Sequence, residues 1–170
     1  RSVIITHLIG GLGNQMFQYA IGRALSLTRR VPLRLDTRGF EGYALHNGYE
    51  LERVFNISAQ LASEADSRRV MGWRASPMVL RALRQKRLSL LRGSKIVIEQ
   101  GFSYWPLIVN VPDDCYLQGF WQSEKYFLRY APAIRADYSF KQPLEAHNRE
   151  LVRRIGQCTA VSISGKITLE

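Results

Sequence analysis

A cluster of glycines near the start of the chain is the first place where chemistry could occur. The stretch LIGGLGNQMFQYA (Leu8–Ala20) puts Gly10, Gly11 and Gly13 directly before Asn14 and an apolar run at helical spacing. Glycines allow a ligand to approach the backbone closely, and the free amides of a helix N-terminus attract anions. The pattern fits either a cradle for a phosphate or pyrophosphate, or a tight structural turn.

Neither common phosphate motif fits this turn. A P-loop requires Gly-Lys-Ser/Thr after the turn, where this chain has Asn14, Gln15 and Met16. A dinucleotide-binding fingerprint requires a third glycine at position 16, which is the methionine. We expect the side-chain oxygen of Asn14 to cap the following helix. The residues themselves leave the kind of anion open.

Several side chains farther along could contact a sugar. Asp36 ends an apolar stretch and could hold a sugar hydroxyl, act as a base, or be a solvated or capping carboxylate. Trp121 offers an indole face for stacking on an acceptor sugar, or it belongs to the core. Gln122 and Ser123, the other acceptor candidates, could bond hydroxyls. Asp36 is thus a candidate base, and the catalytic residue stays unassigned. His7 lies inside an apolar run and is expected to be a satisfied core histidine, and His46 and His147 show no partner pattern.

A strand–helix–strand unit must position the glycine turn. The segment SVIITHLI (Ser2–Ile9) is β-branched and almost continuously apolar, as is typical of a strand buried on both faces. A period of 3.6 residues indicates a helix from Gln15 to about Thr28, and VPLRLD (Val31–Asp36) indicates a second strand. Such a βαβ unit has parallel strands, so the glycine turn follows the carboxyl end of the first strand.

The rest of the chain continues the alternation. We expect a short element at Tyr49–Ile57, helices at Ala59–Met71, Pro77–Arg92, after Ser123 and at Leu144–Ile155, and strands at Lys95–Glu99, Cys115–Ser123 and Thr159–Ile163. This order predicts an α/β fold with a Rossmann-like, doubly wound parallel sheet. Ligands of such sheets bind at the carboxyl ends of the strands, where the glycine turn lies.

The net charge of +10 favours an anionic partner, which could be a nucleic acid, a membrane or a phosphorylated ligand. The predicted helix Pro77–Arg92 is basic and amphipathic. It is either a solvated face whose arginines cover apolar surface, or a contact with anionic lipid. No nucleic-acid motif appears, and basic residues do not gather with aromatic residues on one strand. We therefore expect no nucleic-acid partner. A small basic domain that binds nucleic acid is kept as the alternative function.

The number of cysteines and the length of the apolar runs argue against a disulfide-rich, a zinc-binding and a membrane-spanning protein. Cys115 and Cys158 are too few for a disulfide framework or a zinc site, and we expect both to be buried free thiols. No apolar run reaches the ~20 residues that a spanning helix needs, and no signal-peptide pattern is visible.

Two blocks of the chain resemble those of one enzyme family. The segment IGGLGNQMFQYAIGRAL (Ile9–Leu25) is similar to the N-terminal signature of bacterial α-1,2-fucosyltransferases, glycosyltransferase family 11. The segment YLQGFWQSEKYF (Tyr116–Phe127) resembles the second recurring block of that family, and VPLRLDTRGF (Val31–Phe40) is compatible with the family pattern directly after the first block. The resemblance covers most of the chain, from Val3 to Ile163.

The resemblance implies one lobe of a two-lobed GT-B glycosyltransferase, with residues 1–163 as an N-terminal, mainly acceptor-side lobe. Such enzymes transfer fucose from GDP-fucose to the 2-hydroxyl of a galactose, with inversion and without a metal or other cofactor. Their glycine turn faces the donor diphosphate across the cleft. The residues that the resemblance places at the diphosphate are Gly11, Gly13, Asn14 and Gln15.

The chain departs from the family pattern at its end. The family continues with a His-x-Arg-Arg-Gly-Asp segment that contacts the donor diphosphate, whereas here Ser164–Glu170 stand in that place. We therefore expect residues 164–170 to be an atypical tail and the C-terminal donor-binding lobe to be absent. Such a chain would bind GDP-fucose weakly, turn over little or nothing, and self-associate through an exposed interlobe face. A non-catalytic scaffold domain is a further interpretation.

The implied partners are GDP-fucose and a galactose-containing acceptor glycan, which could be lipid-linked. We expect a cytoplasmic bacterial protein that could lie peripherally at the inner membrane. There the basic helix and a lipid-linked acceptor would meet.

Overall fold

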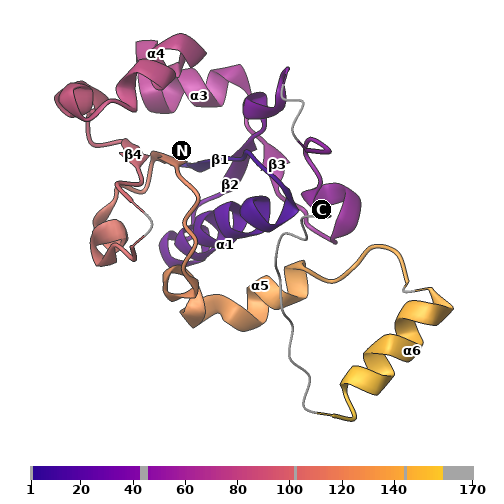
Figure 1. Cartoon of the computed structure of the whole chain (residues 1–170). Coiled ribbons are helices and arrows are strands. Elements are labelled where there is room, and N and C mark those ends of the chain that lie inside the picture. The colour runs from indigo at the N-terminus through magenta and orange to yellow at the C-terminus, as the bar shows by residue number, and fades with distance from the viewer. Residues whose placement is uncertain (1, 43–45, 102, 144, 159–170) are drawn as a thin grey trace, which may run out of the picture.

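The computed structural model describes residues 2–42, 46–101, 103–143 and 145–158 (Figure 1). They form a five-stranded parallel sheet in the order β3-β2-β1-β5-β4, with helices on both faces. The strands are β1 (Ile4–His7), β2 (Leu33–Asp36), β3 (Gln60–Leu61), β4 (Ile96–Ile98) and β5 (Cys115–Gln118). This confirms the predicted Rossmann-like, doubly wound α/β fold, which is compatible with one lobe of a GT-B glycosyltransferase.

The central strand β1 sets the geometry of the sheet. All of its residues are buried, because helices cover both of its faces. His7 lies opposite Asp36 of β2, and Thr6 lies opposite Leu117 of β5. In this register, the segments that follow β1, β2 and β5 leave the sheet side by side at its carboxyl edge.

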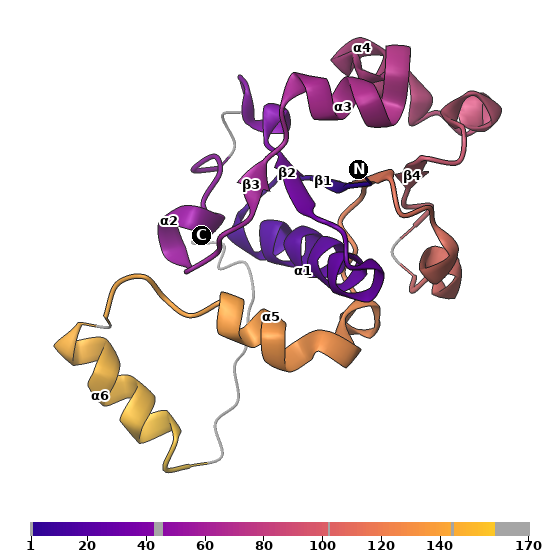
Figure 2. The same cartoon turned by 180° about the vertical axis from the view of Figure 1, so that it is seen from behind.

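Helix α1 (Leu12–Arg29) packs along one face of the sheet (Figure 2). Ile21 and Leu25 of the helix join Ile4 and Leu35 of the strands in the main core cluster. Gly22 brings the helix close to the sheet, because a Cβ atom at this position would lie only 2.1 Å from the Thr6 hydroxyl oxygen.

A second layer of helices covers the opposite face. It consists of α3 (Glu64–Met71), the 3₁₀ segment η2 (Gly72–Ala75), α4 (Pro77–Leu83) and the 3₁₀ segment η3 (Lys86–Arg92). Figure 1 shows α3 and α4 above the sheet, with α1 and α5 below it. Buried side chains of this layer, Val70, Leu80 and Leu83 among them, pack against Ile5 and Tyr116 of the strands.

The remaining elements lie around these two layers. They are the helices α2 (Leu51–Val54), α5 (Ala131–Asp137) and α6 (Ala146–Ile155), and the 3₁₀ segments η1 (Arg38–Phe40), η4 (Pro106–Asn110), η5 (Glu124–Tyr126) and η6 (Leu128–Tyr130). Helix α6 has no buried residue and stands away from the sheet in both views (Figures 1 and 2). The predicted strand Thr159–Ile163 and the predicted tail 164–170 fall outside the described residues.

The predicted single helix Pro77–Arg92 is wrong, because the chain turns after α4. Gln85 adopts an extended conformation between α4 and η3. Arg92 then folds back, and its guanidinium donates hydrogen bonds to the carbonyl oxygens of Leu83 at 2.7 Å and Arg84 at 3.2 Å. Arg92 thereby satisfies carbonyl groups that the end of α4 leaves open.

Three other boundaries also differ from the prediction. Helix α3 begins only at Glu64, because the preceding Gln60–Leu61 pairs with β2. Strand β5 ends at Gln118, where the chain turns sharply. Ser123 does not cap an α-helix, because two 3₁₀ segments follow it instead.

The two cysteines lie in different environments. Cys115 is a buried free thiol in β5, as predicted, and burial raises its pKa to about 12. Cys158 follows α6 and is exposed, so its predicted burial is wrong.

The close contact at Gly22 gives a test of the α1 packing. Replacement Gly22→Ala forces a methyl group against Thr6 and Leu33, and we expect it to lower the free energy of unfolding by about 2 kcal/mol. The matched variant Gly13→Ala meets no atom within 4 Å and should keep stability or raise it by up to ~1 kcal/mol. Urea unfolding followed by circular dichroism measures both. Equal stability of the two variants would contradict the packing described here.

Candidate functional site

The glycine turn lies at the carboxyl end of β1, beside the ends of β2 and β5. The backbone N–H of Leu8 donates to the carbonyl oxygen of Asp36 at 2.9 Å, which fixes the exit from the sheet. Gly10 has a φ of +87°, a conformation that favours glycine. Gly11 is the N-cap of α1, where no side-chain cap is present among the described residues. Asn14 therefore lies within the first turn of the helix, and its predicted role as N-cap is wrong.

Gln15 holds the turn from inside the protein. Its side chain is fully buried, and its amide nitrogen donates to the carbonyl oxygens of Gly10 and Gly48, both at 2.8 Å. Its amide oxygen accepts from the backbone N–H of Glu50 at 2.9 Å. These bonds saturate the amide. The structure therefore gives Gln15 a structural role and no exposed group for a diphosphate.

A hydrogen bond joins the two sequence blocks that were singled out for chemistry. The side-chain nitrogen of Gln122 donates to the side-chain oxygen of Asn14 at 2.8 Å, across 108 positions of the chain. Gln122 is exposed and Asn14 is partly exposed, so the pair lies at the surface of the carboxyl edge. The turn after β1 and the turn after β5 thus form one surface.

Glu99, which follows β4, fixes the turn after β5. Its carboxylate accepts hydrogen bonds from the backbone N–H groups of Phe120 at 2.7 Å and Trp121 at 3.1 Å. A Cβ atom at Gly119 would lie 2.4 Å from the Cβ atom of Glu99, so only glycine fits beside this carboxylate. Sequence patterns alone gave no indication of this role for Glu99.

Trp121 is part of the core. Its side chain is fully buried, and its ring meets that of Tyr126 edge-on with 5.6 Å between centroids. Its indole therefore presents no face to a sugar, and the stacking interpretation is wrong for the described conformation. Ser123 is half-buried, and its backbone N–H donates to the carbonyl oxygen of Trp121 at 2.7 Å. Gln122 is the acceptor candidate that remains available to a ligand.

On the opposite face of the sheet, the same edge opens into a pocket of about 530 Å³, which is lined by charged, polar and apolar side chains. An adjoining pocket of about 320 Å³ extends it past β4 and β5. The two pockets share His7, Ile9, Arg84 and Gln118. The strand sequences IITH and CYLQ contain the signal for this pocket, because alternation puts Ile5, His7, Tyr116 and Gln118 on one face.

Asp36 anchors the larger pocket. Its buried carboxylate accepts hydrogen bonds from the guanidinium of Arg38 at 2.8 and 2.9 Å and from the Tyr116 hydroxyl at 2.8 Å. Burial alone would raise the pKa of Asp36, but the bonds and charge of Arg38 and the Tyr116 hydroxyl outweigh it and lower the pKa. Burial beside this carboxylate raises the pKa of Tyr116 well above its ordinary value. A saturated carboxylate of low pKa is poorly suited to be the base for which Asp36 was a candidate.

His7 lies at the junction of the two pockets. It is only 9% exposed, and burial lowers its pKa from 6.5 to about 4, so the imidazole is neutral at pH 7. Its Nδ1 atom has no hydrogen-bond partner among the described residues. The expected core position of His7 is therefore confirmed, but the expectation that its polar atoms are satisfied is wrong, because the buried Nδ1 atom lacks a partner.

Two features are absent from the described part of the chain. Residues 2–42, 46–101, 103–143 and 145–158 contain no cluster of three His, Cys, Asp or Glu side chains with the geometry of a metal site. The predicted metal independence stays a prediction. In the same ranges, no helix has both the length and the apolar character that crossing a bilayer requires.

Comparison with known proteins gives one informative relative. The chain is 34% identical over 135 residues to an alpha-1,2-colitosyltransferase of Escherichia coli. The aligned region is 79% of this chain and 44% of that protein, so the chain spans less than half the length of the relative. No protein-family model matches the chain, and no solved structure matches it.

The buried neutral imidazole of His7 gives a test by pH. Below pH 6.5 the unfolded chain protonates this residue, but the folded chain does so only near pH 4. The unfolded state thus binds more protons, and stability falls as the pH is lowered, by about 2–3 kcal/mol between pH 6.5 and 4.5. We expect His7→Gln to remove most of this fall in urea unfolding curves.

The exposed His147 provides the matched control, since His147→Gln should keep the fall in stability. The lowered pKa of Asp36 affects stability only below its ordinary value of 3.8, which lies outside the pH range of the His7 test. An unchanged slope in His7→Gln would show that another group takes up the proton.

Proposed function

Since the chain is similar over most of its length to a bacterial α-1,2-glycosyltransferase, we propose that it is the N-terminal lobe of such an enzyme. The reaction we propose is transfer of fucose from GDP-fucose to the 2-hydroxyl of a galactose, with inversion. The name of the relative makes colitose the second candidate for the transferred sugar. The similarity supports glycosyl transfer by itself, and the choice of sugar is our proposal.

The observation that carries the proposal is the hydrogen bond between Asn14 and Gln122. It joins the glycine turn after β1 to the turn after β5, at the carboxyl edge of the central strands. The strand order changes direction at this place. From β1 the chain adds β2 and β3 on one side of the sheet, and it then crosses to the other side of β1, where β4 and β5 lie. Open α/β sheets bind their ligands at such a switch point.

The chemistry of the glycine turn suits the leaving group of this reaction. Breaking the bond between the sugar and the diphosphate puts negative charge on the β-phosphate. The open N-terminus of α1 has no acidic residue in its first turn, so its backbone amides and dipole favour that charge. Stabilisation that grows as the charge develops accelerates the reaction.

Asn14 is positioned to add a donor beside these amides. Gln122 donates to its side-chain oxygen, which leaves the side-chain nitrogen to donate to a ligand. That nitrogen lies over Gly10, where a Cβ atom would approach it to 2.7 Å. A larger residue at position 10 would therefore displace the amide, which explains the glycine at this position.

For the acceptor we propose the two pockets beside His7 together with Gln122. The side chains of His7 and Gln118 line both pockets, and they suit sugar hydroxyls because the imidazole and the amide are polar and uncharged. Asp36 organises this wall through Arg38 and Tyr116. The base that removes the proton from the 2-hydroxyl is not assigned to any of these residues.

Titration of the chain with GDP, followed by GDP-fucose, tests the donor half of the proposal. We expect weak binding, because base and ribose contacts come from a second lobe in two-lobed transferases. Asn14→Ala should weaken the affinity for GDP by about 10- to 100-fold, the usual effect of losing a hydrogen bond to a charged group. Isothermal calorimetry at millimolar nucleotide, on protein whose fold is checked by circular dichroism, measures this loss.

Gln122→Ala is the matched control. It removes the same Asn14–Gln122 hydrogen bond but keeps the Asn14 amide, so the affinity for GDP should change less than about threefold. Equal losses of GDP affinity in both variants would mean that the Asn14–Gln122 hydrogen bond only holds the two turns in place, and that the Asn14 amide does not bind the nucleotide itself. Unchanged affinity in Asn14→Ala would contradict a donor site at the glycine turn.

A further inference from the structure

The outer layer of helices has an unusual charge distribution. From Gly72 to Lys95 the chain contains seven basic residues and no acidic residue. We call this stretch the basic layer; it comprises η2, α4 and η3 and leads into β4. The seven are Arg74, Arg81, Arg84, Lys86, Arg87, Arg92 and Lys95.

Some of these basic side chains have hydrogen-bond or ion-pair partners within the protein, and others have no carboxylate partner among the described residues. Arg92 is buried against the end of α4, and Lys95 pairs with Asp114 at 2.8 Å. Arg81, Lys86 and Arg87 are exposed, and none of them has a carboxylate partner among the described residues. The free positive charge of the basic layer therefore points outward.

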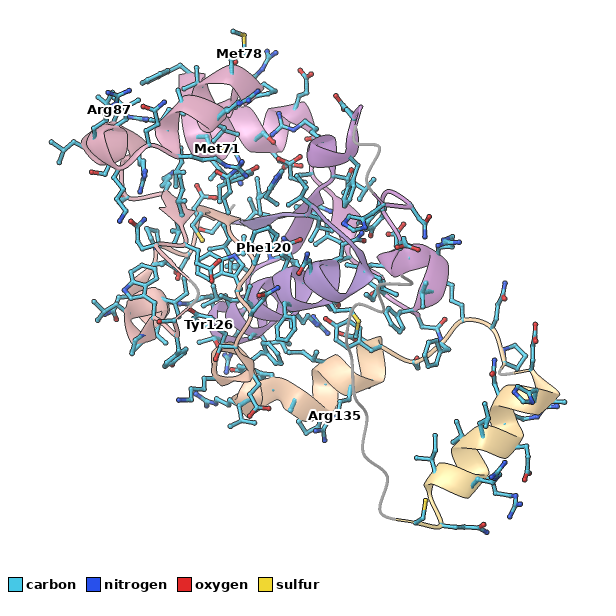
Figure 3. All side chains as sticks on the ribbon, viewed as in Figure 1. Met71, Met78, Arg87, Phe120, Tyr126 and Arg135 are labelled. Carbon is cyan, nitrogen blue, oxygen red and sulfur yellow. The ribbon has the colours of Figure 1, made fainter. Side chains whose placement is uncertain are left out.

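Large apolar side chains stand beside these free cations. Met78 is 82% exposed and Leu90 is 94% exposed, while Trp73 is 63% exposed under the guanidinium of Arg74, 4.9 Å from the ring centre. Figure 3 shows Met78 and Arg87 on the outer side of the helical layer, with Arg135 at the opposite end of the molecule. Exposed aliphatic residues among free cations suit a partner that offers both an apolar interior and negative charge.

The inner side of the same layer is already committed to the core. Leu80 and Leu83 are buried against the sheet, so the exposed apolar residues are additional to those that stabilise the fold. Their exposure is not a consequence of poor packing beneath them. Arg92 also keeps α4 and η3 together, which fixes the outward side.

We propose that the basic layer binds the surface of an anionic phospholipid bilayer. Arg81, Lys86 and Arg87 would meet the headgroup phosphates, while Met78 and Leu90 would enter the boundary between headgroups and acyl chains. A nucleic acid would use the cations equally well but would gain nothing from exposed aliphatic side chains. The combination therefore favours a lipid surface.

This orientation has a consequence for the larger of the two pockets beside His7. Leu80 and Arg81 of α4, and Arg84 directly after it, line the pocket of about 530 Å³, so the membrane-facing helix is also a pocket wall. A polar group attached to a lipid would reach the pocket without leaving the bilayer surface. This second step rests on the proposed function, whereas lipid binding itself does not.

Vesicle sedimentation of the full chain tests the proposal. We expect binding to vesicles of phosphatidylglycerol mixed with phosphatidylcholine, no binding to phosphatidylcholine alone, and weaker binding as salt is raised. Lys86→Glu combined with Arg87→Glu should weaken binding by about 30-fold or more, from the typical contribution of two basic residues at an anionic surface. Arg129→Glu combined with Arg135→Glu changes the net charge equally, away from the basic layer, and should retain most of the binding.

A second pair of variants tests the apolar contribution. Met78→Ser with Leu90→Ser should reduce binding, whereas Leu107→Ser with Val109→Ser, each 59% exposed on η4, should not. Equal effects of the two charge variants would overturn the proposal, because binding would then follow net charge alone. Binding of duplex RNA that is insensitive to the Met78 and Leu90 changes, with no vesicle binding, would also overturn it in favour of nucleic acid.

Discussion

The buried carboxylate of Asp36 ties the two halves of the sheet to the outer helices. It ends β2 and accepts from Tyr116 of β5, so one hydrogen bond spans the central strand between them. Arg38, held by the same carboxylate, continues to the Ser67 hydroxyl and the Ala75 carbonyl oxygen, both at 3.3 Å. A buried charge is costly unless it is paired, so this network fixes the register and the exits of the strands together.

The same edge has two sides of different chemistry. On the side of α1 there are backbone amides, the Asn14–Gln122 pair and no acidic residue in the first turn, which suits a phosphate. On the side of α4, the charges of Asp36 and Arg38 satisfy each other, and His7 is neutral. Arg81 and Arg84 also line this side, so it combines a neutral imidazole with positive charge. In the reaction that we propose, the diphosphate leaving group would lie on the α1 side of this edge and the sugar acceptor on the α4 side.

Sequence patterns predicted those helices, strands and turns that depend only on residues close together in the chain. The strand, glycine turn, helix and strand up to Asp36 were found within two or three residues, because their burial period is visible in the sequence. Long-range contacts decided the rest. The division of Pro77–Arg92 depends on Arg92 folding back, the saturation of Gln15 depends on Gly48 and Glu50, and the His7 pocket depends on strands distant in the chain.

The turn after β5 shows why a recurring block need not consist of ligand contacts. Trp121 has a φ of +57°, a conformation that costs a bulky residue about 1–3 kcal/mol and persists only where its surroundings enforce it. Here Glu99 holds its backbone, Gly119 leaves room for that carboxylate, and the buried indole locks the turn. The strained turn directs the next residue, Gln122, onto Asn14. Most of this block therefore positions one amide, and its glycine and tryptophan are explained by backbone geometry without a sugar.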